Sequence, residues 1–254
     1  MFEQAAESNP MNTRRTVGGW WRHACALMLF GVSLPSMADG LWGGSLDMTS
    51  DYLVRGISRS NDQAAVQLDV HYFNSDGLLV GAFASSAQID PGASRDAELS
   101  GFLGYAWSVS ANWQGKILAT HYSYPWNQAG SSYNYDEVDF EAVYDAWLGV
   151  TVAYSPNMPH YVAYRGFVGT NAEAIELNVQ RPLVGRLSGT AGCGYEYFGS
   201  ADPAGYAYGS VGAAYDLAPV VLAVTFVDTT SAAKSLFYNA AAGGRWAGTV
   251  VWRF

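Results

Sequence analysis

The segment GGRWAGTVVWRF, residues 243–254, alternates along its length in a way that decides the fold. At the even-numbered positions from Trp246 to Phe254 every residue is apolar or glycine. The odd-numbered positions from 245 to 253 include Arg245, Thr249 and Arg253. A period of two residues is typical of a strand whose two faces meet different environments. The apolar face favours lipid as one of them, and its large side chains are Trp246, Val250, Trp252 and Phe254.

The rest of the chain repeats this pattern in segments of roughly ten residues, the length of a transmembrane strand. We expect twelve strands, at 44–56, 64–73, 78–87, 96–107, 111–123, 135–145, 147–155, 172–181, 186–198, 206–216, 219–228 and 245–254. Short turns alternate with longer connections, which predicts an all-β antiparallel transmembrane barrel with short periplasmic turns and long extracellular loops. Tyr161–Val168 is open: it is either a thirteenth strand or part of the fourth long loop, and the even count favours the loop.

Residues 1–38 have the parts of a cleaved secretory signal. Arg14, Arg15 and Arg22 precede an apolar stretch, and small residues lead up to Ala38. The apolar stretch is too short to span a bilayer, which needs about 20 residues. A twin-arginine signal fits less well. We therefore expect a signal at 1–38 and the barrel at 39–254, with Met11 as an alternative start.

Charge and cysteine content exclude several classes of function. The formal net charge of −9 argues against nucleic acid as a partner. Cys25 is lost with the predicted signal, so Cys193 remains alone and forms no intramolecular disulfide. The sequence contains no HExxH motif, phosphate-binding loop or cysteine pair, so we expect no cofactor and no metal site.

Aromatic side chains near the predicted strand ends favour a membrane barrel, because such barrels carry aromatic girdles at both interfaces. The alternative is a soluble sandwich or lipocalin-like barrel whose aromatics fill a core. The terminal Phe254 separates the two, because it resembles the insertion signal of outer-membrane barrels. The expected partners are therefore outer-membrane lipid and the barrel-assembly machinery, and the expected location is the outer membrane of a Gram-negative bacterium.

The segment SDYLVRGISRSNDQAAVQ, Ser50–Gln67, resembles the TorF-type porin family, formerly the uncharacterised Gcw_chp bacterial domain. Further similarity lies in HYSYP (121–125), YDEVDFEAVY (135–144) and GCGYEYF (192–198), whereas residues 157–172 depart from the family pattern. The resemblance implies an outer-membrane barrel assigned to transport by analogy. It carries no catalytic residues over to this chain.

Strand parity separates a lipid face from a lumenal face. Lipid-facing candidates include Tyr52, Val54, Leu68, Val70, Leu99, Leu103, Ile117, Val138 and Phe140. The candidate lumen and constriction residues are Asp47, Asp51, Arg55, Asp69, His71, Glu98, Lys116, Glu137, Asp139, Glu141 and Arg245. The same face also carries Gln67, Asp96, Gln114, Glu176, Asn178, Glu196 and Arg253. Its acids outnumber its bases, which favours cations, although ion pairs across the lumen could equally close it.

These observations predict a narrow, cation-preferring porin or channel for small solutes. One alternative is a closed-lumen barrel with a structural role or a role in binding through its loops. A third hypothesis, an outer-membrane hydrolase, rests only on Asp69 and His71 sharing one face near Ser50 and Asp51, so no catalytic residue is assigned. We expect Arg55 to pair with Asp51 or Asp69 in the constriction. The sequence leaves the solute, gating and oligomeric state open.

Overall fold

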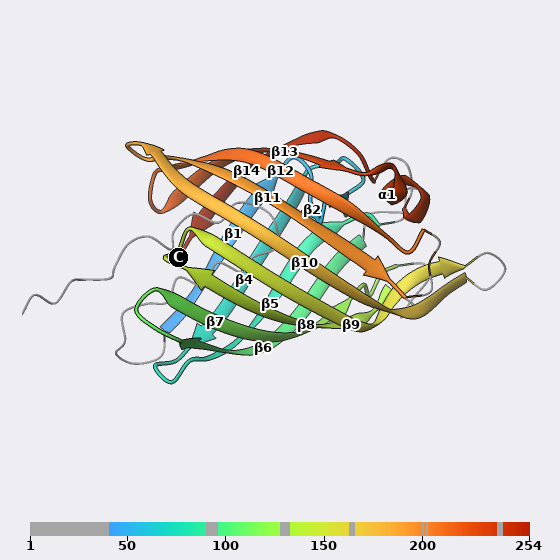
Figure 1. Ribbon diagram of the computed structural model, residues 1–254, viewed down its shortest axis with the longest axis horizontal. Coiled ribbons are helices and arrows are strands. Elements are labelled where there is room, and N and C mark those ends of the chain that lie inside the picture. Colours follow the sequence, from blue (N-terminus) through green and yellow to red (C-terminus); the bar gives the residue numbers. More distant parts are fainter. Residues whose placement is uncertain are drawn as a thin grey trace, which may run out of the picture.

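The computed structural model describes residues 41–89, 96–127, 133–162, 166–199, 201, 203–237 and 241–254 (Figure 1). The predicted signal lies outside the described residues, so its cleavage remains a prediction. Within the described ranges no helix is long and apolar enough to cross a membrane.

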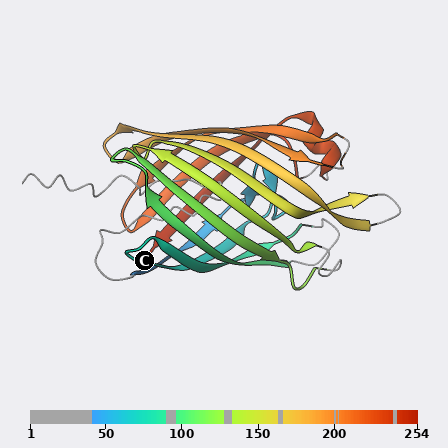
Figure 2. The same ribbon diagram turned by 60° about the horizontal axis from the view of Figure 1, so that its bottom comes forward.

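Twelve of the described strands close into one antiparallel barrel, which confirms the predicted fold (Figures 1 and 2). Its strands are β1 Leu41–Thr49, β4 Ala65–Phe73, β5 Leu78–Ala87, β6 Asp96–Ser108, β7 Trp113–Ser123, β8 Tyr135–Tyr144, β9 Leu148–Val162, β10 Gly166–Val184, β11 Leu187–Phe198, β12 Gly205–Asp216, β13 Val220–Thr229 and β14 Arg245–Arg253. Neighbours in the chain are neighbours in the barrel, and β14 closes it by pairing with β1. At this seam Ser45 lies opposite Arg253 and Thr49 opposite Thr249.

The outer surface of the barrel is apolar because side chains alternate along each strand. In β6 the outward Leu99, Leu103 and Tyr105 are exposed, whereas the intervening inward residues are buried. The outward face of β14 likewise exposes Trp246 and Trp252. A continuous apolar surface of this kind is not tolerated in water, and lipid is the environment that suits it. This surface excludes the soluble-barrel alternative.

The strand connections differ in length at the two ends of the barrel. Turns of two to four residues, such as 74–77 and 185–186, lie at the end that also holds the described chain termini. There the backbone amide of Phe254 donates to the carbonyl of Gly44 at 3.1 Å, which ties down the C-terminus. Longer connections, including 50–64 and 230–244, lie at the other end. We call these the short-turn end and the long-loop end.

The first predicted strand is wrong in its second half. The prediction runs to residue 56, but β1 ends at Thr49 and the chain then turns into the barrel. Two short strands, β2 Leu53–Val54 and β3 Ile57–Ser58, form a separate hairpin. Tyr52 and Val54, predicted to face lipid, are consequently buried inside. The alternation of apolar residues continues from β1 into β2, so strand parity alone did not reveal that the chain turns inward after Thr49.

The undecided segment Tyr161–Val168 belongs to two long strands. β9 continues to Val162 and β10 begins at Gly166, so the segment spans the tip of their hairpin. Residues 163–165 lie outside the described part of the chain. The two strands project beyond the rest of the long-loop end (Figures 1 and 2). The segment therefore adds length to two predicted strands and leaves the barrel count unchanged.

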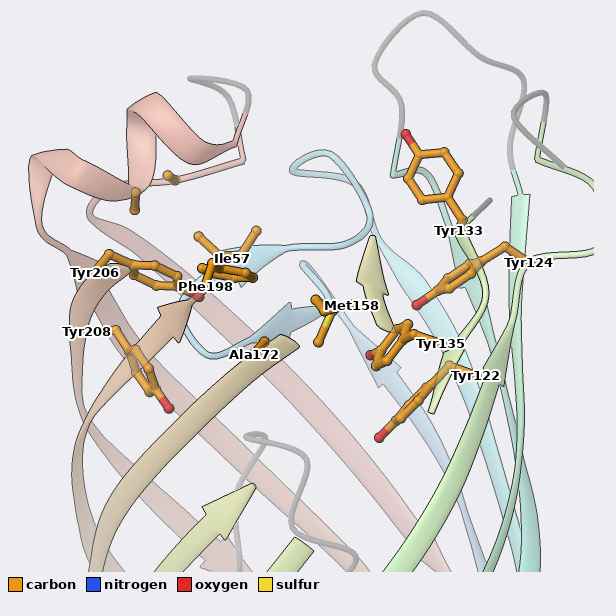
Figure 3. Packing of buried hydrophobic residues seen from close by; sticks show 12 residues of the cluster. Ile57, Tyr122, Tyr124, Tyr133, Tyr135, Met158, Ala172, Phe198, Tyr206 and Tyr208 are labelled. Carbon is orange, nitrogen blue, oxygen red and sulfur yellow. The ribbon is translucent and has the colours of Figure 1, made fainter. Parts of the chain in front are cut away.

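A short helix, α1 Ser231–Leu236, lies in the connection between β13 and β14. Its buried Ala233 belongs to a cluster with Phe198 and Tyr206, whose side chains face the interior at the long-loop end (Figure 3). The helix therefore packs over part of the barrel mouth.

Candidate channel lumen and constriction

Residues 50–64, which connect β1 to β4, fold into the barrel and are called the inward loop. The side chain of Asp51 organises this loop, because its carboxylate accepts hydrogen bonds from the hydroxyls of Ser58 at 2.6 Å and Ser60 at 2.9 Å. The backbone closes around the same point, where the amide of Arg59 donates to the carbonyl of Tyr52 at 2.7 Å. The inward loop is therefore built by residues within ten positions of one another.

The tip of the inward loop is a tight turn formed by Arg55 and Gly56. Both have positive φ, 49° and 80°, as a two-residue turn between antiparallel strands requires. Glycine is needed at position 56 for a second reason, since a Cβ there would lie 2.6 Å from Cγ2 of Thr229. The turn brings the hairpin close to the wall and aims Arg55 onward across the lumen.

The hairpin packs against the wall formed by the four consecutive strands β11 to β14. Leu53 packs against Val227 of β13 and Ala247 of β14. Ile57 belongs to the aromatic cluster that includes Phe198 of β11 and Tyr206 of β12, as Figure 3 shows. These apolar contacts hold the inward loop against this wall within the upper lumen.

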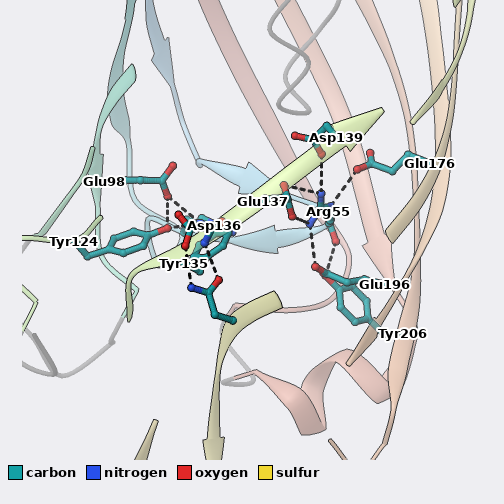
Figure 4. A network of polar contacts seen from close by, with 12 residues as sticks. Arg55, Glu98, Tyr124, Tyr135, Asp136, Glu137, Asp139, Glu176, Glu196 and Tyr206 are labelled. Carbon is teal, nitrogen blue, oxygen red and sulfur yellow. Dashed lines mark hydrogen bonds and ion pairs between the residues drawn. The ribbon is translucent and has the colours of Figure 1, made fainter. Parts of the chain in front are cut away.

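Arg55 lies among four carboxylates on the wall formed by β8, β10 and β11 (Figure 4). Its guanidinium donates two hydrogen bonds to Glu137, at 2.8 and 3.0 Å, and one each to Glu176 and Glu196, both at 3.1 Å. Asp139 lies 3.9 Å away. We call Glu137, Asp139, Glu176 and Glu196 the carboxylate cage. The guanidinium supplies one positive charge against four acids, so the cage carries an excess of negative charge.

The structure corrects the predicted partner of Arg55. The prediction placed Arg55 on a strand beside Asp51 and Asp69, but the hairpin carries it to strands far along the chain. Asp51 instead pairs with Arg245, whose Nη1 lies 3.3 Å from its Oδ2. Asp69 instead lies 2.5 Å from Nδ1 of His71. Arg55 is buried inside the barrel beside Glu137, Glu176 and Glu196, and its place in a constriction stays a prediction.

Arg59 is a second anchor of the inward loop and was missed in the sequence, where it fell within an expected loop. Its Nη1 donates to Glu98 at 2.9 Å and also to the hydroxyl of Tyr124, and its Nη2 donates to Tyr135 at 2.9 Å. Glu98 is fully buried and also accepts from the hydroxyls of Tyr52 at 2.7 Å and Tyr124 at 2.6 Å. A basic residue next to the family-like SDYLVRGIS stretch was the signal available in the sequence.

Arg245 is the third anchor, on the opposite side of the lumen. Besides Asp51 it contacts Asp62, also in the inward loop. Burial raises the pKa of the Asp62 carboxyl, the charge of Arg245 opposes the rise and Asp51 adds to it. Three arginines thus hold the loop, two of them reaching out from it and one reaching in from β14.

The remaining predicted lumenal residues lie on the inward parity of their strands. Lys116 and Glu141 form an ion pair of 2.6 Å between β7 and β8. Asp47 of β1 and the Asp69–His71 pair of β4 line another part of the wall. Ser50 is exposed, and its Oγ accepts a hydrogen bond from the amide of Gly248. His71 lies opposite Gly43, near the start of β1, whereas Ser50 follows the last residue of β1. The two side chains are therefore far apart along the strand and form no serine–histidine pair.

Comparison with known proteins identifies the family and the fold. The model of a family described as bacterial protein of unknown function (Gcw_chp) matches residues 42–253. A search of curated proteins found no match.

Among solved structures, the NanC porin is similar in fold, with a TM-score of 0.54 and 8% identity over 83% of this chain and 98% of its own. The KdgM porin gives a TM-score of 0.52 and 12% identity over 84% of this chain and 99% of its own. At these identities the similarity concerns the fold. The chain therefore belongs to the Gcw_chp family, and it has the barrel fold of outer-membrane porins.

Proposed function

We propose that this protein is a narrow channel of the outer membrane that passes small solutes and prefers cations, with the inward loop as its constriction. The observation that carries the proposal is the charge of the lumen around Arg55, where four acids surround one base. Rings of carboxylates in a confined pore attract cations and repel anions through the same field.

The inward-facing side chains of the whole barrel also carry a net negative charge. The described inward-facing acids are Asp47, Asp51, Asp69, Asp96, Glu98, Glu137, Asp139, Glu141, Glu176, Glu196 and Asp216, and the bases are Arg55, Arg59, Lys116, Arg245 and Arg253. The acids are more than twice as numerous as the bases, so ion pairing within the lumen leaves an excess of negative charge.

Buried hydroxyl groups favour a hydrated lumen. The inward hydroxyls of Ser100, Thr120, Thr151 and Thr225 have no hydrogen-bond partner among the described residues. Buried polar groups are normally satisfied, and water is the partner that remains for these. A hydrated interior suits a pore better than a dry packed core.

The known porins support transport but not the same solute. Their fold, together with the resemblance to TorF-type porins, favours a channel over an enzyme. One solved structure is the KdgM porin in complex with disordered oligogalacturonate, which is a polyanion. The acidic lumen described above is unsuited to such a ligand, so we propose that the solutes of this protein differ in charge.

A closed-lumen barrel with a structural or loop-mediated binding role is the second candidate. The burial of the inward loop and its three arginine anchors favour it. Single-channel recording of the purified, refolded protein in a planar bilayer separates the two. We expect a small conductance. In a KCl gradient, the reversal potential should have the sign that selectivity for K⁺ over Cl⁻ produces. Absence of conductance would leave the closed barrel, and anion selectivity would refute the charge argument.

A further inference from the structure

We propose that the carboxylate cage is a binding site for the guanidinium group of a solute, and that Arg55 occupies this site as an internal competitor. The physiological meaning of the site rests on the proposed channel function, whereas the binding itself does not. A guanidinium-bearing solute would replace Arg55 in the cage and release the inward loop from the wall formed by β8, β10 and β11.

The wall of the cage has room for a planar cation. Asp139 on β8 lies opposite Ala153 on β9, which lies opposite Ala174 on β10, which in turn lies opposite Glu196 on β11. Two small buried residues therefore separate the acids on either side, over roughly 14 Å of wall at the usual strand spacing. Glutamate side chains from both sides of this wall converge on Arg55 (Figure 4).

The cage has more acceptor capacity than Arg55 uses. A guanidinium has five N–H donors and one charge, and the four carboxylates present eight oxygens, one of which, Oε2 of Glu196, already accepts from the hydroxyl of Tyr206 at 2.7 Å. Asp139 is only at ion-pair distance from Arg55. The site is thus not matched to one arginine, and its planar, acidic geometry suits bidentate recognition of guanidinium.

Two buried hydroxyls on β9 point independently to a ligand. Thr151 lies directly opposite Glu176 in the sheet, and Ser155 lies two pleats further along the same inward face. Their side chains are almost completely buried and their hydroxyls have no partner among the described residues. They flank the alanine floor and offer acceptors that Arg55 does not reach.

The competitor is attached in a way that permits exchange. Arg55 is at the tip of a two-strand hairpin whose strands do not pair with any strand of the barrel sheet. The backbone of the tip receives a single hydrogen bond from a barrel strand among those given for it, in which the hydroxyl of Tyr206 on β12 donates to the carbonyl of Arg55 at 3.1 Å. Replacing one guanidinium by another leaves the charge of the cage unchanged, so the exchange avoids the cost of uncovering buried acids. What is lost is the set of contacts that hold the tip against the wall.

The test uses methylguanidinium chloride and the full refolded protein, with tetramethylammonium chloride at equal ionic strength as the reference salt. The thermal midpoint of barrel unfolding is followed by the loss of the compact band on unheated gels. In Arg55→Ala the cage is vacant, so methylguanidinium should raise the midpoint. In the wild type Arg55 competes, and the half-maximal concentration should be at least about tenfold higher.

Matched variants separate specific binding from a general salt effect. Lys116→Ala removes one lumenal positive charge outside the cage, and Arg55→Ala combined with Glu137→Gln and Glu196→Gln removes half of its acids. Lys116→Ala should respond to methylguanidinium like the wild type, because Arg55 still occupies its cage, whereas the triple variant should lose the preference for methylguanidinium. Equal stabilisation of Lys116→Ala and Arg55→Ala would overturn the proposal, as would the absence of stabilisation in Arg55→Ala. If Arg55→Ala fails to fold, Arg55→Lys serves in its place, because an ammonium lacks the bidentate fork and should compete less well.

Bilayer recording distinguishes failure of the site from failure of the channel. Conducting Arg55→Ala protein should show brief blocks by methylguanidinium that the reference cation does not produce. Stabilisation without conductance in any variant would reject the channel and retain the site. Conductance without selective stabilisation or block would reject the site and retain the channel.

Discussion

Replacing Arg55 by alanine should destabilise the barrel measurably, because the change leaves acids facing one another in a confined space. The Arg55 side chain is 9% exposed, and those of Glu137 and Glu196 are each 6% exposed. Breaking a buried ion pair by removing one partner costs about 3–5 kcal/mol. Because water in the lumen can partly solvate the freed carboxylates, we expect about 3 kcal/mol, the lower end of this range.

The assay is equilibrium urea unfolding of the refolded protein in lipid vesicles, followed by tryptophan fluorescence. Arg55→Lys keeps the charge but loses the two parallel hydrogen bonds to Glu137, so it should lose less, about 1–2 kcal/mol. A double-mutant cycle with Glu137→Gln should give a coupling energy of about 1–3 kcal/mol. A change below about 0.5 kcal/mol in Arg55→Ala, the size expected of an ordinary surface substitution, would refute the reasoning that Arg55 anchors the inward loop.

Three further predictions concern location, insertion and the turn. The protein should be recovered in the outer-membrane fraction and migrate differently on gels when unheated, and recovery as a soluble periplasmic protein would contradict the lipid-facing assignment. Deleting Phe254, or changing Trp252 and Phe254 to Ser, should lower the amount inserted in cells while refolded protein retains its conductance; undiminished insertion would reject the C-terminal signal. Gly56→Ala should loosen the inward loop and increase conductance, since its positive φ disfavours a side chain by about 1–2 kcal/mol and its Cβ would meet Thr229. Gly166→Ala is the control, with a similar φ but no atom within 4 Å, so an equal effect on conductance would show that strain alone is responsible.

Local sequence determined the barrel wall. Whether a side chain points to lipid or to the lumen depends on its parity and on the two environments, and both are readable within ten residues. That is why Leu103 and Ile117 are outward, Glu137 and Lys116 are inward, and the strand count agrees with the structure. The turn at Asn74–Gly77 was readable for the same reason, since its residues favour a turn wherever they stand.

Only the tertiary structure decided what fills the upper lumen. The residues Tyr52, Val54 and Gly56 continue the alternation of β1, so nothing local separates a strand that runs on from a hairpin that turns inward. The difference lies in contacts made with distant walls. Arg55 meets Glu137 and Glu196, which are 82 and 141 residues away in the chain. These partners become neighbours only when β14 closes onto β1, because barrel closure brings β8 and β11 to the inward loop.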